Sequence, residues 1–362
     1  MRKRSLPIIL IILVTALIVG ACGAKQSDTP AIEPTSTQTA ETQPSTKIDT
    51  SESDGMCSET ETAAQPRPEA RPWHFVVITH GSATSKFWAV VKNGVEQAAE
   101  DMRVQADYQS PDTFNLDAMA KMIDDAVAAH PDGIAVSIPN AEILGPHIQK
   151  ALDAGIPVVS LNSGSGVAEQ LGVLGHFGQS EYTAGSAAGD RLSKAGVTRG
   201  LCLIQEADNT ALQVRCQGFA DALSNANGSV TNLVVETDDP VQAQKLIADA
   251  LAQDANIDGI LALGPSVGEP ALDALQENDL IGKVKLAAFD LSPTMLQALK
   301  DGEMLFLVDQ QPYLQGYLPI MYLTLYHQNL SKPAVKITLT GPDLITKEDA
   351  ARVEAYSQES LR

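Results

Sequence analysis

The chain has 362 residues, a formal net charge of −20 at pH 7 and only 4% aromatic residues. This excess of acidic residues opposes binding to a phosphate backbone, so nucleic acid is not an expected partner. The six histidines form neither an H-E-x-x-H motif nor a close pair with cysteine. The sequence therefore predicts no metal site and no cofactor.

The first 21 residues are predicted to be a secretory signal. Residues 2–4 are basic, and an apolar run over residues 6–19 follows. That run is shorter than the roughly twenty residues of a membrane-spanning helix. It ends in V-G-A-C at residues 19–22, which resembles the lipobox of bacterial lipoproteins. The resemblance implies a chain outside the cytoplasm, in the periplasm or at the cell surface, anchored to the membrane through lipid on Cys22.

Residues 22–72 are predicted to form a flexible tether between the membrane and the folded part. The segment consists mainly of Ser, Thr, Glu, Gln, Pro and Ala. Such a composition cannot bury enough apolar surface to offset its conformational entropy. Cys57 lies within the tether, and the sequence assigns it no role.

Two further cysteines are predicted to form a disulfide. Cys202 lies in an apolar, strand-like run, and Cys216 lies on the helix that follows. They are close in sequence, and an exported chain is in a compartment that favours disulfides. We therefore expect a Cys202–Cys216 bridge.

From Trp73 onward, short apolar runs alternate with longer amphipathic ones. Strands are predicted over 75–79, 103–108, 133–137, 157–161, 200–205, 232–236, 259–263, 285–289 and 304–309. Helices are predicted near 87–101, 115–129, 141–154, 181–195, 211–225, 241–253, 270–278, 294–300 and 313–329. This alternation is typical of parallel sheets with right-handed crossovers. About 290 residues exceed one core, so the predicted fold is α/β with two doubly wound parallel-sheet lobes.

Ligands of such sheets bind beyond the carboxyl ends of the strands, so the residues after each apolar run are the candidates. The loop after the first strand leads into a helix that begins with Phe87 and Trp88. Both rings could belong to the core between helix and sheet. However, two adjacent rings on a helix point in different directions, so we expect at least one to face the cleft, where it suits the apolar face of a sugar ring.

Polar side chains follow several other strands. Asp290 ends an apolar run, where an unpaired carboxylate is costly. It could accept two ligand hydroxyls, or it could cap the helix from Pro293. Arg215, two turns into a helix that follows Asn209, offers several fixed donors to a ligand, or it could form a salt bridge between domains. Further candidates are the amides Asn162, Gln179 and Gln310.

The motifs of common enzymes are incomplete. The run from Gly81 to Lys86 lacks the second glycine and the following Ser or Thr of a phosphate-binding loop. Residues 162–166 contain no G-x-S-x-G elbow. We therefore predict that the protein is not an enzyme.

Taken in order, these features resemble the type I periplasmic binding proteins of ABC sugar importers, the ribose- and galactose-binding group. The resemblance covers about residues 74–345. It rests on T-H-G…F-W..V-K-N-G at 79–94, G-I-P-V-V-S-L-N-S-G at 155–164, G-H-F-G-Q-S-E-Y-T-A-G at 175–185, N…R.G at 209–218, F-D at 289–290 and D-Q-Q-P-Y-L-Q-G-Y-L-P at 309–319. The pocket it implies consists of Ser85, Phe87, Trp88, Asn162, Gln179, Asn209, Arg215, Asp290 and Gln310.

The same resemblance implies a three-strand hinge near Gln179, Gln310 and residues 332–340. The first lobe would comprise 73–179 plus 311–335, and the second 180–310 plus 336–362. The lobes would close on the ligand, and the closed monomer would be recognised by the membrane permease. Departures from the ribose pattern at 85–86, at 162–163 and at 264–266 indicate a hexose or a cyclic polyol such as inositol in place of ribose.

Other functions share this fold. A sugar-responsive repressor would need an N-terminal DNA-binding unit, where this chain has its signal and tether. A nucleoside or autoinducer ligand remains open, as does a membrane sensor in place of a transporter. Two aromatic rings flanking a flat base would favour a nucleoside, whereas an Asp and an Arg opposed to one aromatic face would favour a sugar.

Overall fold

The computed structural model describes residues 72–82, 85–237, 239–359 and 361–362. By its contacts, the segment from Pro66 to Arg362 forms a unit of its own. The predicted signal, the lipid site Cys22 and the tether up to residue 71 with Cys57 lie outside the described residues. Within these ranges, no helix combines the length and apolarity needed to cross a membrane.

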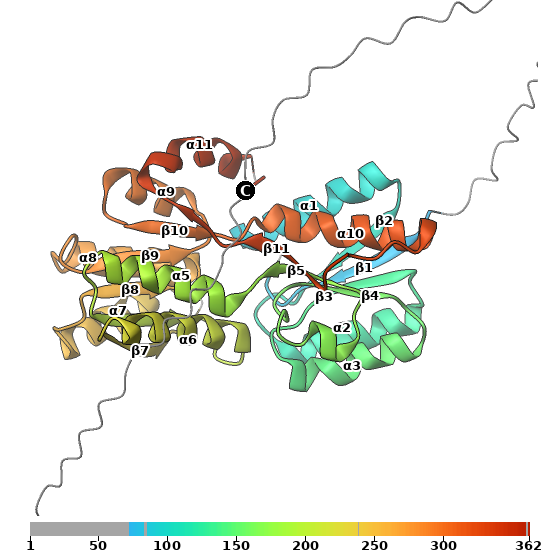
Figure 1. The fold of residues 1–362 in the computed structure, drawn as a ribbon, viewed down its shortest axis with the longest axis horizontal. Coiled ribbons are helices and arrows are strands. Elements are labelled where there is room, and N and C mark those ends of the chain that lie inside the picture. Colours follow the sequence, from blue (N-terminus) through green and yellow to red (C-terminus); the bar gives the residue numbers. More distant parts are fainter. Residues whose placement is uncertain (1–71, 83–84, 238, 360) are drawn as a thin grey trace, which may run out of the picture. The chain divides into compact units, whose positions relative to one another are not determined.

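The first lobe is built on a six-stranded sheet in the order β11-β5-β4-β3-β1-β2 (Figure 1). Its strands are β1 (His74–Ile78), β2 (Gln105–Gln109), β3 (Gly133–Ser137), β4 (Val158–Asn162), β5 (His176–Gln179) and β11 (Ile337–Gly341). All neighbouring pairs are parallel. The central strands are buried along their whole length, as their continuous apolar sequences predict.

Helices cover both faces of this sheet. One face packs against α1 (Lys86–Met102) and α10 (Pro312–Asn329). The other packs against α2 (Leu116–Ala129), α3 (Ala141–Asp153) and the short α4 (Ala168–Leu171). Both faces of the sheet are thus covered by cores of mainly aliphatic side chains, so neither face of its strands has to be polar.

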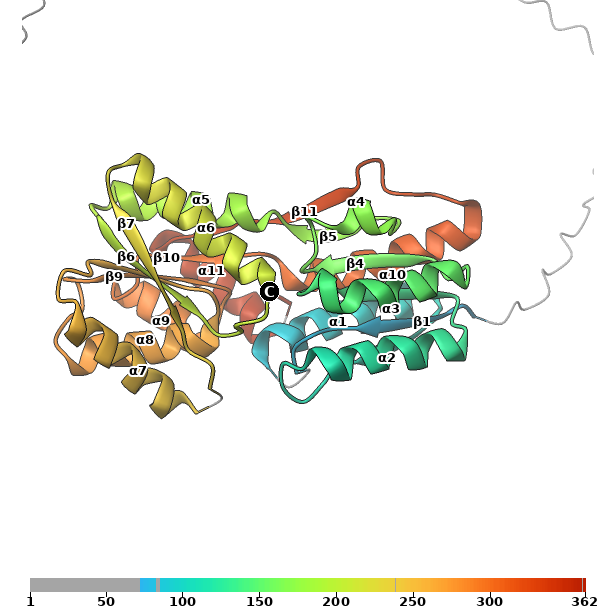
Figure 2. The same cartoon turned by 90° about the horizontal axis from the view of Figure 1, so that it is seen from below.

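The second lobe repeats this plan of a sheet between two layers of helices (Figure 2), and its strand order is β12-β10-β9-β8-β6-β7. Its strands are β6 (Arg199–Ile204), β7 (Ser229–Val234), β8 (Gly259–Ala262), β9 (Lys285–Phe289), β10 (Phe306–Asp309) and β12 (Asp343–Ile345). Only β12 runs antiparallel to its neighbour, β10. On one face lie α5 (Glu181–Lys194) and α6 (Thr210–Asn225), and on the other α7 (Pro240–Gln253), α8 (Pro265–Glu277), α9 (Pro293–Asp301) and α11 (Lys347–Gln358).

The described chain passes between the lobes at three places. These are the step from β5 to α5, the step from β10 to α10, and Pro342 between β11 and β12. The sequence analysis assigned residues from 336 onward to the second lobe. In the structure β11 pairs with β5 of the first sheet, and the chain enters the second sheet only at β12.

The predicted α/β fold with two parallel sheets is confirmed, with differences at its least apolar elements. The sequence analysis did not predict β12 or α11 as elements, and it treated β5 and β11 only as hinge segments. The helix α11 buries few side chains, among them Ala350 and Val353, and its start is marked by a capping box between Thr346 and Asp349. The helix α8 begins at Pro265, five positions before its predicted start, because proline suits the first helical turn.

Each lobe contains one close helix crossing made by a pair of glycines. A Cβ at Gly94 of α1 would lie 2.1 Å from the Tyr313 carbonyl oxygen of α10, and one at Gly316 would lie 1.9 Å from the Val91 carbonyl oxygen. Likewise, a Cβ at Gly185 of α5 would lie 2.0 Å from the Arg215 carbonyl oxygen of α6, and one at Gly218 would lie 2.2 Å from the Tyr182 carbonyl oxygen. Backbone cannot move aside as a flexible side chain can, so these helices pack at distances only glycine permits.

Replacement of Gly316 by alanine is expected to lower the free energy of unfolding by about 1–3 kcal/mol, the usual cost of overpacking. The matched control is Gly166→Ala, because a Cβ there has no neighbouring atom within 4 Å. Urea unfolding followed by circular dichroism would measure both variants. Equal stabilities of the two variants would contradict the close crossing of α1 and α10.

Candidate functional site

A cavity of about 570 Å³ lies between the lobes, at the carboxyl ends of strands from both sheets. The first lobe contributes His80, Gly81, Ser82, Ser85, Phe87, Trp88, Asp112, Thr113, Phe114, Asn162 and Ser163. The rest of the wall consists of Gln205, Glu206, Asn209, Leu212, Arg215, Glu236, Thr237, Pro240, Leu263, Ser266, Asp290 and Gln310. Eight of the nine predicted ligand residues are in this wall.

The aromatic side of the cavity belongs to the first lobe. Trp88 packs edge-on against His80 and Phe87, with ring centroids 4.7 and 5.0 Å apart. Phe114 meets His80 in the same manner at 5.9 Å. Trp88 is only 6% exposed and also belongs to the core, so the two alternatives considered for it, core and cleft, both hold. This packing fixes the orientation of the rings before any ligand arrives.

His80 is a neutral member of this wall. Its backbone N–H donates to Ser137 Oγ, and its Nδ1 lies 2.8 Å from the same oxygen. Burial, followed by the nearby charge of Arg215, lowers the pKa of His80 to about 3. The imidazole therefore carries no charge at neutral pH.

Asp290 projects from the end of β9 into the cavity wall. Asp290 has a left-handed φ of 66° and is 9% exposed. Its Oδ1 accepts a hydrogen bond of 2.7 Å from Gln310 Nε2. Burial raises the pKa of Asp290 to about 7, although Arg215 and Gln310 act in the opposite direction. The alternative role as a helix cap is wrong, because Ser292 caps α9.

Arg215 lies beside Asp290 on α6. Its Nε donates to Glu181 Oε2, its Nη1 donates to the Leu263 carbonyl at 3.3 Å, and its guanidinium lies 4.5 Å from the ring centre of Phe289. Burial is the largest influence and would lower the pKa of Arg215, but the charge and hydrogen bond of Glu181 together with the charges of Asp290 and Glu206 outweigh it, and the pKa is raised. Glu181 belongs to α5 of the same lobe, so the alternative of a salt bridge between domains is wrong for this pair.

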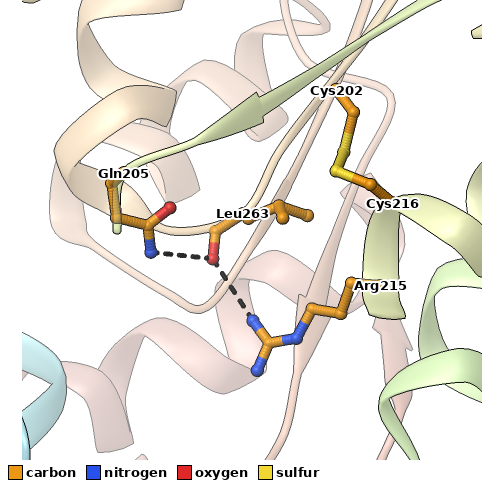
Figure 3. Close-up of a disulfide and its surroundings, with 5 residues drawn as sticks. All are labelled: Cys202, Gln205, Arg215, Cys216 and Leu263. Atoms are coloured by element: carbon orange, nitrogen blue, oxygen red, sulfur yellow. Dashed lines mark hydrogen bonds between the residues drawn. A yellow bond between two sulfur atoms is a disulfide. The ribbon is translucent and has the colours of Figure 1, made fainter. Parts of the chain in front are cut away.

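The predicted disulfide between Cys202 and Cys216 is confirmed and supports Arg215. It joins β6 to α6, with the two Cα atoms 5.9 Å apart. Figure 3 shows the bridge close to Arg215, the residue that directly precedes Cys216, and shows Gln205 and Arg215 both donating to the Leu263 carbonyl. The bridge therefore fixes the start of α6 against the sheet.

In the double variant Cys202→Ala/Cys216→Ala the free energy of unfolding is expected to be about 3 kcal/mol lower, which is the chain-entropy value for a loop of this size. The two cysteines are 14 residues apart. Urea titrations of the oxidised protein and the variant would measure the difference. Coincident unfolding curves would show that the bridge contributes nothing.

Asn209 acts mainly through its neighbours. Its Oδ1 caps α6 by accepting from Ala211 N at 3.1 Å, and its Nδ2 donates to Glu206 Oε2 at 2.7 Å. Glu206 was not predicted. Burial raises the pKa of Glu206, and the hydrogen bond from Asn209 only partly opposes that effect. Asn209 therefore positions a carboxylate in the cavity wall.

A chain of amides joins the lobes behind the cavity. Asn162 Nδ2 donates to Gln315 Oε1 at 3.0 Å and to Gln310 Oε1 at 3.3 Å. Gln310 in turn donates to Asp290. Asn162 has a left-handed φ of 59°, which turns its side chain from the end of β4 toward this network. These amides connect the first sheet to the carboxylate of the second lobe.

Two predicted ligand residues have other contacts. Gln179 is not part of the cavity wall, is fully buried, and donates to Glu181 Oε2 at 3.2 Å. It thus supports the partner of Arg215. Ser85 lines the cavity but also caps α1 by accepting from Trp88 N.

Three carboxylates and one aromatic ring of the wall were not predicted from the sequence. They are Asp112, Glu206, Glu236 and Phe114. Asp112 and Phe114 follow β2, and Glu236 follows β7. Residues after a strand were the candidates, so correct strand ends would have indicated these side chains. However, β2 extends one residue beyond its predicted end, and β7 stops at Val234, two residues before its predicted end. Both are edge strands with exposed positions, so their apolar pattern is weak.

Within the described ranges, no group of three or more His, Cys, Asp or Glu side chains could hold a metal ion. The arrangement in the cavity offers instead a rigid aromatic wall, a buried carboxylate and a fixed guanidinium. Groups of this kind are suited to bind and orient a polar ligand that also has an apolar face.

Comparison with known proteins places the chain in a family. The sequence profile of the family described as "Periplasmic binding protein domain" matches residues 75–329. The chain belongs to the periplasmic binding proteins. As a member of this family it is a binding protein and not an enzyme.

Several known proteins are similar to this chain over most of their length. The crystal structure of a carbohydrate transporter from Acidothermus cellulolyticus 11B in complex with myo-inositol has a TM-score of 0.76 and 32% identity, covering 80% of this chain and 100% of that one. The xylose/arabinose-binding protein XylF of Sulfolobus acidocaldarius is 26% identical, over 72% of this chain and 67% of its own. The D-ribose/D-allose-binding protein of Pseudomonas aeruginosa is 21% identical, over 65% and 76%.

Proposed function

We propose that the chain is the extracytoplasmic binding component of an ABC importer and captures a monosaccharide, a hexose or a related cyclic polyol. The observation that carries this proposal is the division of the cavity into an aromatic wall on the first lobe and Asp290 with Arg215 on the second. A sugar ring has an apolar face that packs on Trp88 and a rim of hydroxyls that both donate and accept. The relatives named above, which bind sugars or inositol, support the same class of ligand.

The geometry favours a sugar over a nucleoside. Phe87 and Trp88 meet at an interplanar angle of 89°, so they do not form parallel faces on two sides of a flat base. All the aromatic rings of the wall come from the first lobe, and the opposite side presents charged groups. An arrangement of this kind suits one face of a saturated ring.

Capture would proceed by closure of the two lobes about the three crossings described above. The lobes already touch at one edge of the cleft, where Thr210 N and Oγ1 donate to the Pro139 carbonyl at 3.0 and 2.8 Å. In this proposal residues 73–179 with 311–341 move against residues 180–310 with 343–362. A lipid on Cys22 and the tether would keep the monomeric protein near its permease.

Binding is expected to release a proton and to strengthen as the pH rises from 6 to 8. Burial raises the pKa of Asp290 to about 7. At pH 6 this carboxyl is therefore protonated in most molecules of the ligand-free protein. Ligand hydroxyls stabilise the carboxylate, and the affinity at pH 6 should be about tenfold lower than at pH 8. His80, whose pKa is about 3, does not titrate in this range.

Isothermal titration in two buffers of different ionisation enthalpy would measure this proton release. Repetition with Asp290→Asn provides the control, because that variant has no carboxyl to titrate. An affinity independent of pH in the unmodified protein would contradict a ligand contact at Asp290.

The function itself is tested by a thermal-shift screen of residues 66–362 against hexoses, pentoses, inositols and nucleosides. We expect stabilisation by a hexose or a cyclic polyol, because a ligand that binds only the folded state raises its stability. Stabilisation by nucleosides alone would contradict the proposal of a monosaccharide ligand and support the hypothesis of a nucleoside ligand.

A further inference from the structure

The cavity wall contains more negative charge than positive. Among the described residues that line it, the carboxylates are Asp112, Glu206, Glu236 and Asp290, and the only cation is Arg215. That cation is already engaged, since Glu181 accepts from its Nε in a buried ion pair. Lys86, at the start of α1, also forms an ion pair, because its Nζ lies 3.2 Å from Glu269 Oε1.

The described part of the wall also contains a buried hydrogen-bond acceptor that no donor satisfies. Gln205 Oε1 is buried, lies in a residue of the cavity wall, and accepts from no described residue. Its amide nitrogen donates to the Leu263 carbonyl (Figure 3). Glu206, its neighbour, has a raised pKa because burial is opposed only by Asn209 and Arg215. A ligand that supplies donors would satisfy both groups.

The carboxylates that act on the pKa of Arg215 are Glu181, Asp290 and Glu206, and Asp112 and Glu236 are not among them. Asp112, from the loop after β2, and Glu236, from the loop after β7, are exposed residues of the wall that belong to opposite lobes. Closure of the lobes would bring these like charges toward each other in a medium of falling dielectric constant. A positive charge on the ligand would reverse that cost, whereas a negative charge would add to it.

We propose that the cavity prefers a monosaccharide or cyclic polyol that carries a protonated amine, an amino sugar or aminocyclitol, and rejects polyols that carry a carboxylate or phosphate. An ammonium group has three donors and no acceptor, which matches the acceptors of Glu206, Glu236 and Asp112. Its place is on the part of the ring that points away from Arg215. This inference rests on the proposed function and deepens it.

Isothermal titration of residues 66–362 with matched ligands tests the preference. The sets are galactose, galactosamine and galacturonate, and the corresponding glucose derivatives, with N-acetylglucosamine as the uncharged control for size. At low ionic strength we expect the amine to bind about tenfold tighter than its parent sugar and the uronate not to bind. The ratio of amine to parent affinity should fall as salt is added, because exposed charges are screened.

The variant Asp112→Asn/Glu236→Gln is expected to bring the ratio of amine to parent affinity close to one. The ratio is measured within one variant, so effects common to both ligands cancel. Asp190→Asn/Glu100→Gln removes the same charge from exposed positions of α5 and α1 outside the wall, and it should retain the preference.

An amine that binds no tighter than its parent would overturn the inference, as would a uronate that binds as well as the parent. A preference that survives in Asp112→Asn/Glu236→Gln would also overturn it. Failure of the proposed function looks different, since in that case no polyol of any charge would bind.

Discussion

Replacement of Asp290 by alanine is expected to weaken binding of the monosaccharide about 100-fold or more. The carboxylate is buried in the cavity wall and held by Gln310 Nε2 at 2.7 Å, so it is oriented before the ligand arrives. Hydrogen bonds to a charged group that is removed from water typically contribute about 1.5–3 kcal/mol each. Two ligand hydroxyls on one carboxylate therefore account for a loss of this size. Isothermal titration measures it directly.

Replacement of Asp290 by asparagine should not harm the fold, which separates lost binding from unfolding. Burial raises the pKa of Asp290 to about 7 in the folded protein, above its ordinary value of 3.8. A raised folded-state pKa means that this carboxyl favours folding at low pH and loses that contribution as pH rises from 3.8 through 7. At pH 8, Asp290→Asn should therefore unfold at the same temperature as the unmodified protein or higher. Ligand-induced stabilisation that persists in Asp290→Ala would exclude the assigned role.

Replacement of Arg215 by methionine is expected to abolish binding and to destabilise the protein by about 3–5 kcal/mol. The substitution leaves Glu181 buried at 4% exposure without its cation. Glu181 Oε1 has no hydrogen-bond partner among the described residues even with Arg215 in place. Breaking the pair thus leaves a buried carboxylate without a cation, with the neutral amide of Gln179 as its remaining donor among the described side chains.

The double variant Arg215→Met/Glu181→Gln distinguishes the two effects. Neutralising Glu181 removes the isolated charge, so most of the stability should return, measured as the midpoint of urea unfolding. Ligand affinity should remain lost, because the guanidinium is still absent. Recovery of affinity in the double variant would assign Arg215 a purely structural role.

The order of helices and strands was predictable where burial is complete. The strands β3 and β4 are buried at every position, and their apolar runs gave bounds close to those observed. The edge strand β7 is exposed at four of its six positions, and its predicted bounds were displaced by about three residues. Burial imposes the apolar pattern, so elements with little burial leave little signal in the sequence.

The candidate site could be predicted as a set of strand ends but not as a set of contacts. The positions of Asp290 and Asn162 followed from the rule that ligands bind beyond the carboxyl ends of parallel strands. That Glu181 would hold Arg215 depends on the crossing of α5 and α6, where Gly185 meets the Arg215 backbone. Contacts between residues 34 apart in sequence depend on this tertiary packing, which no local pattern encodes.

Trp88 provides the most direct test of the central claim that this cavity captures a monosaccharide. The chain has only two tryptophans, and Trp73 stacks on His327 and does not line the cavity. In Trp73→Phe, Trp88 fluorescence therefore reports on the cavity alone. The account predicts a saturable change on titration with a hexose or cyclic polyol, and no change in the same protein carrying Asp290→Ala. An unchanged spectrum across hexoses, amino sugars and inositols, or a response that survives in Asp290→Ala, would contradict it.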